Sequence, residues 1–193
     1  VAMSIGVQRM VLSEESVSGV MFTLDTESGF DDVVLINATY GLGEGIVSGK
    51  INPDKFCVYK PSLLLGKSPI LKRQLGSKQI KQVSSDKLGE ILSVPISRSQ
   101  QEHFCLNDQE IELLARCALK IEQHYGKPMD IEWAKDGVDG QFYIVQARPE
   151  TVQSQVTSSE HFQLKNAAKA EIIVTGKSVG QRIGQGVARI IAN

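Results

Sequence analysis

Short runs of alternating apolar and polar residues fill the first third of the chain, which is the pattern of half-buried β-strands. These runs predict strands at residues 4–11, 18–24, 32–40 and 55–62, with a further short strand near 78–83. Because only the polar stretch 12–16 separates the first two strands, we expect them to pair with each other in antiparallel fashion. The remainder of 63–83 is rich in lysine and arginine and is interpreted as a basic surface loop.

One long helix is predicted between residues 105 and 128, where apolar side chains recur at helical spacing: Ile111, Leu114, Ala115, Ala118 and Ile121. Asn107 can cap the first turn, and Glu110 completes a capping-box pattern with it. Gly126 and Pro128 end the helix. His124 falls in the last turn, where a cation suits the helix dipole, so we interpret it as a helix-end residue rather than a catalytic one.

A β-hairpin is predicted from strands at 127–134 and 141–148, because the turn between them contains Asp-Gly twice. Pro149 ends the second strand. The expected register leaves Gly137–Gln141 as the loop, and a slip of one residue would move every side chain to the other face. One face of the hairpin is then apolar and is built from Ile131, Trp133, Tyr143, Val145 and Ala147.

Four polar side chains share the other face, at the end of the hairpin away from its turn. The register sets Glu132 opposite Gln146 and Asp130 opposite Arg148. Mg²⁺ prefers oxygen ligands, and Glu132 and Gln146 could supply a carboxylate and an amide oxygen. The Arg148 guanidinium suits phosphate oxygens, while Asp130 could bind metal or hold Arg148 in position. The alternative is a solvated Asp–Arg pair that contributes almost nothing to stability.

A second candidate is the glycine-rich stretch 37–54, which follows a predicted strand. Gly41, Gly43 and Gly45 could let backbone N–H groups approach a phosphate. The spacing fits neither the Walker motif nor the Rossmann fingerprint. A tight glycine turn explains the same pattern.

Composition narrows the functional classes. The chain has 193 residues, 41% of them hydrophobic, which allows one domain or one domain with a piece of another. A net charge of -1 gives no reason to expect binding to nucleic acid or to an anionic membrane. No apolar run approaches the roughly 20 residues of a membrane span, and no secretory signal is visible. Three cysteines without a C-x-x-C pair indicate a reducing compartment, so we expect a cytoplasmic location.

The composition changes after the hairpin. Residues 153–169 are polar and are interpreted as a linker. From 170 to 193, short apolar runs alternate with glycines, which indicates the start of a small β-rich domain too short to bury a core alone. The chain also begins at Val1 without an initiator methionine. We therefore expect a fragment of a longer protein.

Several stretches in a fixed order carry a family resemblance from about Ser4 to Val152: SGVMFTLDTESGF, GLGEGIVSGKINPDKF, DIEWAKDG and YIVQARPETV. Together they resemble phosphoenolpyruvate synthase (pyruvate, water dikinase), within the wider family of dikinases that use phosphoenolpyruvate. The tail TGKSVGQRIGQGVARII resembles the start of that family's phosphohistidine swivelling domain.

The resemblance implies an α+β, ATP-grasp-like fold, with a mostly antiparallel sheet and a long helix packed on it. Residues 1–152 would form the C-terminal part of the nucleotide-binding domain, with ATP and Mg²⁺ as its ligands. It also implies roles for individual residues: Glu132 and Gln146 hold the metal, and Asp130, Arg148 and Glu44 belong to the nucleotide site. Family members pass the β-phosphoryl group of ATP to a histidine on the swivelling domain, and a C-terminal barrel passes it on to pyruvate.

Parts of the family's machinery fall outside this sequence. The family's phosphorylated histidine lies in a Gly-Gly-x-Thr-x-His motif, and none of His103, His124 or His161 has that context. The expected partners are therefore the remaining domains of the same enzyme, and we expect no catalytic residue in this chain and no turnover by it alone. Two other functions stay open: a related dikinase that acts on an antibiotic or a glucan, and a non-enzymatic interaction module.

Overall fold

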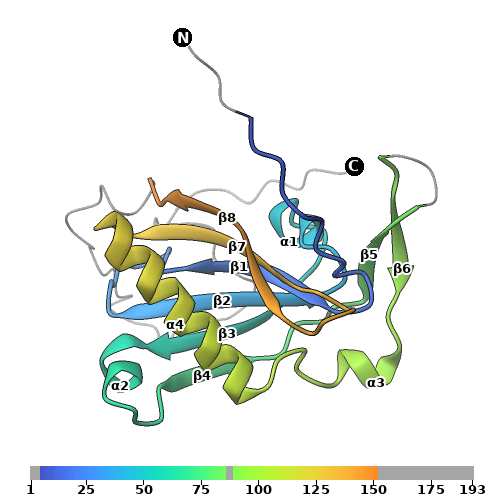
Figure 1. The fold of residues 1–193 in the computed structure, drawn as a ribbon. Coiled ribbons are helices and arrows are strands. Elements are labelled where there is room, and N and C mark those ends of the chain that lie inside the picture. The colour runs from blue at the N-terminus through green and yellow to red at the C-terminus, as the bar shows by residue number, and fades with distance from the viewer. Residues whose placement is uncertain (1–4, 86–88, 152–193) are drawn as a thin grey trace, which may run out of the picture.

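The computed structural model of the chain describes residues 5–85 and 89–151. The predicted linker at 153–169 and the predicted start of a further domain at 170–193 lie outside the described residues. The described residues form a mostly antiparallel sheet with few helices, which confirms the predicted mixture of strand and helix at this level (Figure 1).

The main sheet has six strands in the order β4-β3-β2-β1-β7-β8, and each neighbouring pair is antiparallel. The strands are β1 (Val17–Phe22), β2 (Val33–Tyr40), β3 (Asp54–Tyr59), β4 (Ile70–Gln74), β7 (Met129–Lys135) and β8 (Phe142–Pro149). A separate two-stranded sheet contains β5 (Ile80–Ser84) and β6 (Ile91–Pro95). An isolated bridge between Gly41 and Gln82 joins the two sheets.

The helices are α1 (Glu44–Val47), α2 (Lys60–Leu64), α3 (Arg98–Gln101) and α4 (Asp108–Tyr125). In α4 the side chain of Asn107 accepts from the Glu110 N–H, and the Glu110 side chain accepts from the Asn107 N–H, so the capping box is complete. Gly126 ends the helix in the left-handed conformation, with a φ of 65°. Figure 1 shows α4 lying across one face of the main sheet.

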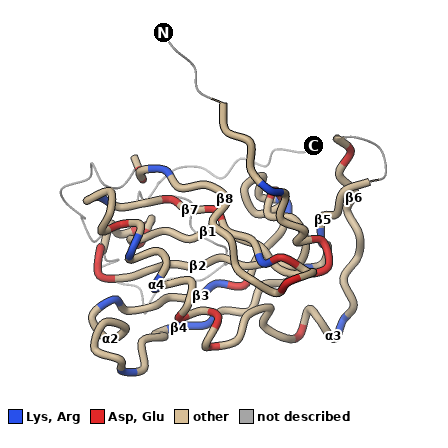
Figure 2. Tube along the Cα trace, in the orientation of Figure 1, with Lys and Arg blue, Asp and Glu red and all other residues tan. Residues whose placement is uncertain are grey.

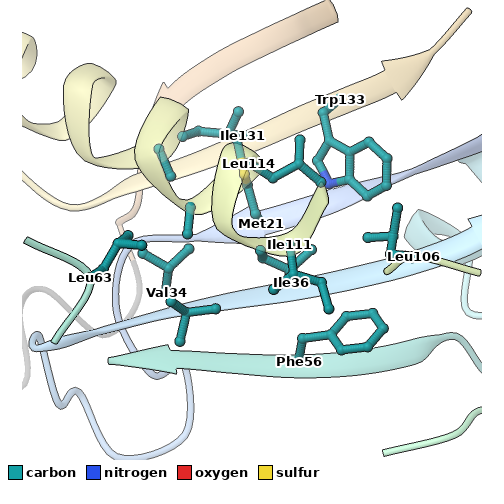
Figure 3. Close-up of a cluster of buried hydrophobic side chains, with 14 of the residues drawn as sticks. Met21, Val34, Ile36, Phe56, Leu63, Leu106, Ile111, Leu114, Ile131 and Trp133 are labelled. Atoms are coloured by element: carbon teal, nitrogen blue, oxygen red, sulfur yellow. The ribbon is translucent and has the colours of Figure 1, made fainter. Parts of the chain in front are cut away.

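The hydrophobic core lies between α4 and the sheet face that it covers (Figure 3). From α4 it contains Ile111, Leu114, Ala115 and Ala118. The sheet contributes alternate residues of four strands: Val17, Met21, Val34, Ile36, Ala38, Phe56, Val58, Met129, Ile131 and Trp133. The residues between them point to the opposite face, here called the distal face, which carries Val20, Phe22, Leu35, Asn37, Lys55, Asp130 and Glu132.

A buried ion pair fixes the start of β3. The carboxylate of Asp54 contacts the ammonium of Lys78, and both side chains are 0% exposed. Asp54 also accepts from the backbone N–H of Gly76 at 2.8 Å and of Cys105 at 2.9 Å. A Cβ on Gly76 would lie 2.3 Å from the Pro53 backbone, so the loop that follows β4 packs too closely for a larger residue. These contacts connect β3 to two loops that are distant in sequence.

The first predicted strand, 4–11, is wrong over its described part, because residues 5–11 form no strand. β1 already pairs with β2 on one edge and β7 on the other, so neither edge is available to an earlier segment. The predicted basic loop within 63–83 also needs correction, because it contains β4. The strand predicted near 78–83 corresponds to β5, whereas β6 was not predicted.

The hairpin register is confirmed at its open end, where Glu132 lies opposite Gln146 and Asp130 opposite Arg148. A β-bulge between Glu132 and Trp133 then shifts the pairing by one residue. The predicted apolar face is therefore correct for Ile131, Trp133 and Ala147 and wrong for the two residues nearer the turn. Phe142 replaces Tyr143 against the core, with its ring centroid 5.7 Å from that of Trp133. Val145 is 44% exposed.

The charged residues are spread over the fold. Figure 2 shows acidic and basic positions interspersed along the described chain, in line with the net charge of -1. Within the ranges 5–85 and 89–151, no helix has the length and apolar character needed to cross a membrane.

Candidate functional site

The ion pair of Asp130 and Arg148 is one part of the candidate site. It lies on the distal face, at the end of the β7–β8 hairpin away from its turn. Arg148 Nε donates to Asp130 Oδ2 at 2.8 Å, and Nη2 forms a salt bridge with the same oxygen at 2.7 Å. Hydrogen bonding to Asp130 raises the pKa of Arg148, and the negative charges of Asp130 and Glu132 raise it further. The Asp130 side chain is 15% exposed and that of Arg148 is 65% exposed. The guanidinium is thus anchored on one edge and accessible on the other.

The contacts between Asp130 and Arg148 involve only part of the carboxylate. Both of its contacts with Arg148 are made by one oxygen, Oδ2. Asp130 therefore pairs with Arg148 through this one oxygen, and both roles expected for it, binding metal and holding Arg148 in position, stay predictions. An arginine fixed in this way presents its remaining N–H groups to an anion without first having to order its side chain.

Glu132 and Gln146 lie next to that pair on the same face. Gln146 Nε2 donates to Glu132 Oε1 at 3.4 Å, a long and weak hydrogen bond. Among the described residues, Glu132 takes part in no salt bridge with a lysine, arginine or histidine. A carboxylate without a cationic partner, beside an amide that can present its oxygen by rotating, fits the oxygen preference of Mg²⁺.

The two residues do not form an all-protein metal cage. In the described part of the chain, no group of three or more His, Cys, Asp or Glu residues is placed to hold a metal ion. Mg²⁺ commonly binds one or two carboxylates and completes its coordination with water and substrate phosphates. The donor set at Glu132 and Gln146 is therefore compatible with Mg²⁺ bound together with a phosphate-bearing ligand.

Glu44 lines a pocket to which the hairpin also contributes. The pocket has a volume of about 650 Å³, and both Glu44 and Glu132 line it. Its remaining walls include apolar side chains from four parts of the chain: Met10, Val11, Val20, Leu42, Val47 and Val145. Asp130, Gln146 and Arg148 lie outside this lining, beside Glu132 on the hairpin. The structure thus brings Glu44 and Glu132 to one pocket and leaves the other three at its border.

The glycine-rich turn before α1 packs closely against β5, and α1 carries Glu44. Gly41 has a φ of 78°, and a Cβ there would lie 2.4 Å from the Gln82 carbonyl oxygen. The Gly41 N–H donates to Ser16 O at 3.0 Å, and the Ser18 hydroxyl donates to Gly41 O at 2.6 Å. The N–H of Gly41 is therefore already bonded within the protein. At this residue, the tight-turn interpretation accounts for the glycine and the phosphate-cradle interpretation does not.

Two groups of pocket residues were missed by sequence reasoning. The segment 8–11 lines the pocket but was assigned to a strand. Tyr143 also lines it, although it was assigned to the core face. Val7 is 97% exposed and Met10 is 76% exposed. These apolar side chains indicate that the segment lies outside the sheet only once both edges of β1 are known to be paired. No signal in the sequence marks the bulge that redirects Tyr143.

The sequence matches the family described as "Pyruvate phosphate dikinase, AMP/ATP-binding domain" over residues 1–169. It is 54% identical to the phosphoenolpyruvate synthase of Pseudomonas aeruginosa over 99% of the chain, and it covers 24% of that protein. It is 49% identical to the phosphoenolpyruvate synthase of Neisseria meningitidis over 99% of the chain, covering 25% of it. A probable phosphoenolpyruvate synthase of Methanocaldococcus jannaschii is 38% identical over 99% of the chain, which covers 15% of that protein. The chain thus spans about a quarter or less of the length of these curated relatives.

Proposed function

Since this chain belongs to the pyruvate phosphate dikinase AMP/ATP-binding domain family, we propose that its distal face binds the phosphates of Mg²⁺-ATP. The observation that carries the proposal is the juxtaposition of Glu132, which has no salt-bridge partner among the described residues, with the anchored guanidinium of Arg148. Transfer of a phosphoryl group depends mainly on charge neutralisation and alignment. A carboxylate–amide pair beside an arginine provides both.

Each residue has a distinct task in this proposal. Glu132 and Gln146 hold Mg²⁺, which neutralises charge on the phosphoryl oxygens when it is bound. Arg148 donates to a phosphate oxygen, and Asp130 keeps the guanidinium in place for that contact. Glu44 accepts a hydrogen bond from a polar part of the nucleotide within the same pocket. The apolar walls between Glu44 and Glu132 suit a flat base or a ribose face and keep water away from the phosphates.

We further propose that the described residues are the C-terminal part of an ATP-grasp-like nucleotide-binding domain, within 1–152. Residues 153–169 would be a linker and 170–193 the start of a phosphohistidine domain. The antiparallel sheet, with a helix on one face and a ligand face on the other, is compatible with this assignment. Within a longer protein, the function would be that of the relatives named phosphoenolpyruvate synthase.

The proposed overall reaction is conversion of ATP, pyruvate and water into phosphoenolpyruvate, AMP and phosphate. The phosphoryl acceptor would be a histidine of another domain, since the resemblance gives His103 and His124 no such role. Other domains of the same enzyme are then the partners of this chain. A dikinase for another acceptor would use the same hairpin, so the sequence of the acceptor domain separates the two functions.

Titration calorimetry with ATP, in the presence and absence of Mg²⁺, tests the nucleotide site. We expect Mg²⁺ to tighten ATP binding by the wild-type chain. The substitution Glu132→Gln removes the charge and keeps the shape, and it should weaken Mg²⁺-dependent binding by about tenfold, which corresponds to one charged contact. Binding in the absence of Mg²⁺ should change little.

Glu112→Gln is the matched control, because Glu112 lies on α4, across the sheet from the distal face, and its one salt bridge within the described part of the chain is a 3.9 Å contact with Arg116. It should bind as the wild type does. Equal heats for wild type and Glu132→Gln in the presence of Mg²⁺ would remove Glu132 from the metal site. Binding that ignores Mg²⁺ altogether would favour a non-enzymatic interaction module.

A further inference from the structure

The N-terminal segment forms one wall of the pocket without belonging to the sheet. Gln8, Arg9, Met10 and Val11 all line the pocket, together with residues of β7 and β8. The segment has no strand partner over residues 5–11, so no backbone ladder fixes its position. Its position must then depend on contacts made elsewhere along it.

Leu12 makes those contacts with the turn between β7 and β8. The Leu12 N–H donates to Asp136 Oδ2 at 3.2 Å, and the Gly137 N–H donates to Leu12 O at 2.7 Å. These two hydrogen bonds are here called the Leu12 link. Leu12 and Asp136 are 124 residues apart in the sequence. The link thus lies within the pocket wall, between the lining residues Val11 and Ser13.

Asp136 is built into this turn rather than solvated. Its residue is 2% exposed, and Oδ1 accepts from the N–H of Val138 at 2.8 Å and of Asp139 at 3.3 Å. Hydrogen bonds from the Val138 and Leu12 N–H groups lower the pKa of Asp136, so its carboxylate is charged at neutral pH. One buried carboxylate therefore serves two purposes: Oδ1 shapes the turn and Oδ2 holds Leu12.

A weaker second contact joins the same turn to the wall. Arg9 Nη2 lies 3.9 Å from Asp139 Oδ2, and its side chain is 72% exposed. Tyr143, which lines the pocket, donates its hydroxyl to the same oxygen at 2.6 Å. Because an exposed pair at that distance contributes little, the Leu12 link is the main attachment of the segment to the turn.

We propose that Asp136 is a positioning residue that holds segment 8–12 against the β7–β8 turn and so completes the wall of the nucleotide pocket. This inference rests on the proposed function of that pocket. It predicts that the hairpin contributes to ligand binding at both ends: directly through Glu132, and indirectly through the turn. The competing role is purely local, with Asp136 needed only to shape its own turn.

The substitution Asp136→Asn separates the two roles. An amide oxygen in place of Oδ1 can still accept from Val138 and Asp139, so the turn keeps its bonds. The amide NH₂ then faces the Leu12 N–H, which sets donor against donor and breaks the Leu12 link. Leu12→Pro removes the same donor from the other side while leaving Asp136 untouched, and it replaces Asp136→Asn if that variant does not fold.

Two measurements are made on the full chain: hydrogen exchange at Leu12, Gly137 and the β1 amides, and calorimetric titration with Mg²⁺-ATP. In Asp136→Asn we expect faster exchange at Leu12 and Gly137, unchanged exchange in β1, and binding weakened about three- to tenfold. The weakening reflects the smaller fraction of molecules in which the wall is in place. Asp25→Asn is the control, because Asp25 accepts from the Glu27 N–H at 3.0 Å in a similar turn without contacting Leu12.

The outcomes distinguish this inference from the proposed function. Faster exchange at Leu12 with unchanged Mg²⁺-ATP affinity overturns the positioning role and leaves the nucleotide site standing. Unchanged exchange at Leu12 and Gly137 shows that Asp136 does not hold the segment, and it also overturns the inference. Absence of Mg²⁺-ATP binding by the wild type overturns the proposed function itself, and this inference with it.

Discussion

Removing the ammonium of Lys78 should destabilise the fold more than any substitution on its surface. Lys78→Met keeps much of the side-chain length but leaves the Asp54 carboxylate buried without its counter-charge. Both side chains are 0% exposed, so water cannot replace the lost partner without a rearrangement of the β3 region. Uncoupling a buried ion pair in this way costs about 3–5 kcal/mol.

The surroundings of Asp54 favour the lower end of that range. The Gly76 and Cys105 N–H groups still donate to the carboxylate at 2.8 and 2.9 Å, and such donors stabilise a negative charge. We therefore expect a loss of about 3 kcal/mol, a large part of the 5–15 kcal/mol that is typical of a domain, and thus roughly a 1–3 M lower urea midpoint.

Urea unfolding followed by tryptophan fluorescence measures this loss. Trp133 is the single tryptophan of the chain and is 1% exposed in the core, so its emission reports on the folded state. The double variant Asp54→Asn with Lys78→Met removes the uncompensated charge, and it should be more stable than Lys78→Met alone.

Arg98→Met is the matched control, because its partner Glu102 and Arg98 itself are 61% and 91% exposed. Its stability should stay within about 0.5 kcal/mol of the wild type. A loss below about 1 kcal/mol in Lys78→Met, or a double variant less stable than the single one, would refute the claim that the buried charge carries the cost.

Two further predictions follow from the pKa shifts. Asp136 has a folded-state pKa below its ordinary value of 3.8, so the stability it contributes is complete above that pH and is lost as the pH falls through the lower folded value. The thermal midpoints of wild type and Asp136→Asn should therefore converge below about pH 4, and a gap that is constant down to about pH 3 would contradict this. Burial raises the pKa of Cys105 far above its ordinary value, and the nearby Asp54 carboxylate raises it further. In iodoacetamide labelling at about pH 8, followed by peptide mass spectrometry, Cys105 should react more slowly than Cys57 because its thiolate is scarcer; the reverse order would contradict the burial of the thiol.

Alternation along the strands was sufficient to predict the polar cluster and its register. The period of two places Asp130 and Glu132 on one face, and a paired turn fixes which residues they meet on β8. The pairing at the open end of the hairpin does not depend on the rest of the fold, so the structure has the predicted register there. The helix ends at Asn107 and Gly126 are equally local, since they follow from capping chemistry.

Alternation failed where tertiary structure decides the outcome. The bulge after Glu132 adds one residue to a strand without changing its polarity pattern, so Phe142 and Tyr143 exchange roles. The sequence pattern does not predict β4, because most of its residues are charged or polar. Residues 71–74 are exposed, which is typical of an edge strand. Its pairing depends on β3, which lies beyond the intervening α2 and therefore outside any short window of sequence.

The incorrect strand at the N-terminus has the greatest consequence for function. A segment with an alternating pattern would normally join a sheet, but β1 has β2 and β7 on its two edges and offers it no place. Excluded from the sheet, the segment is free to run beside the distal face, where residues 8–11 line the pocket. Because this segment pairs with no strand, other contacts must hold it in position. The turn of the hairpin that carries Glu132 makes two such hydrogen bonds with Leu12. The hairpin recognised from its polar residues would thus determine the position of a pocket wall that the sequence pattern assigns to the sheet.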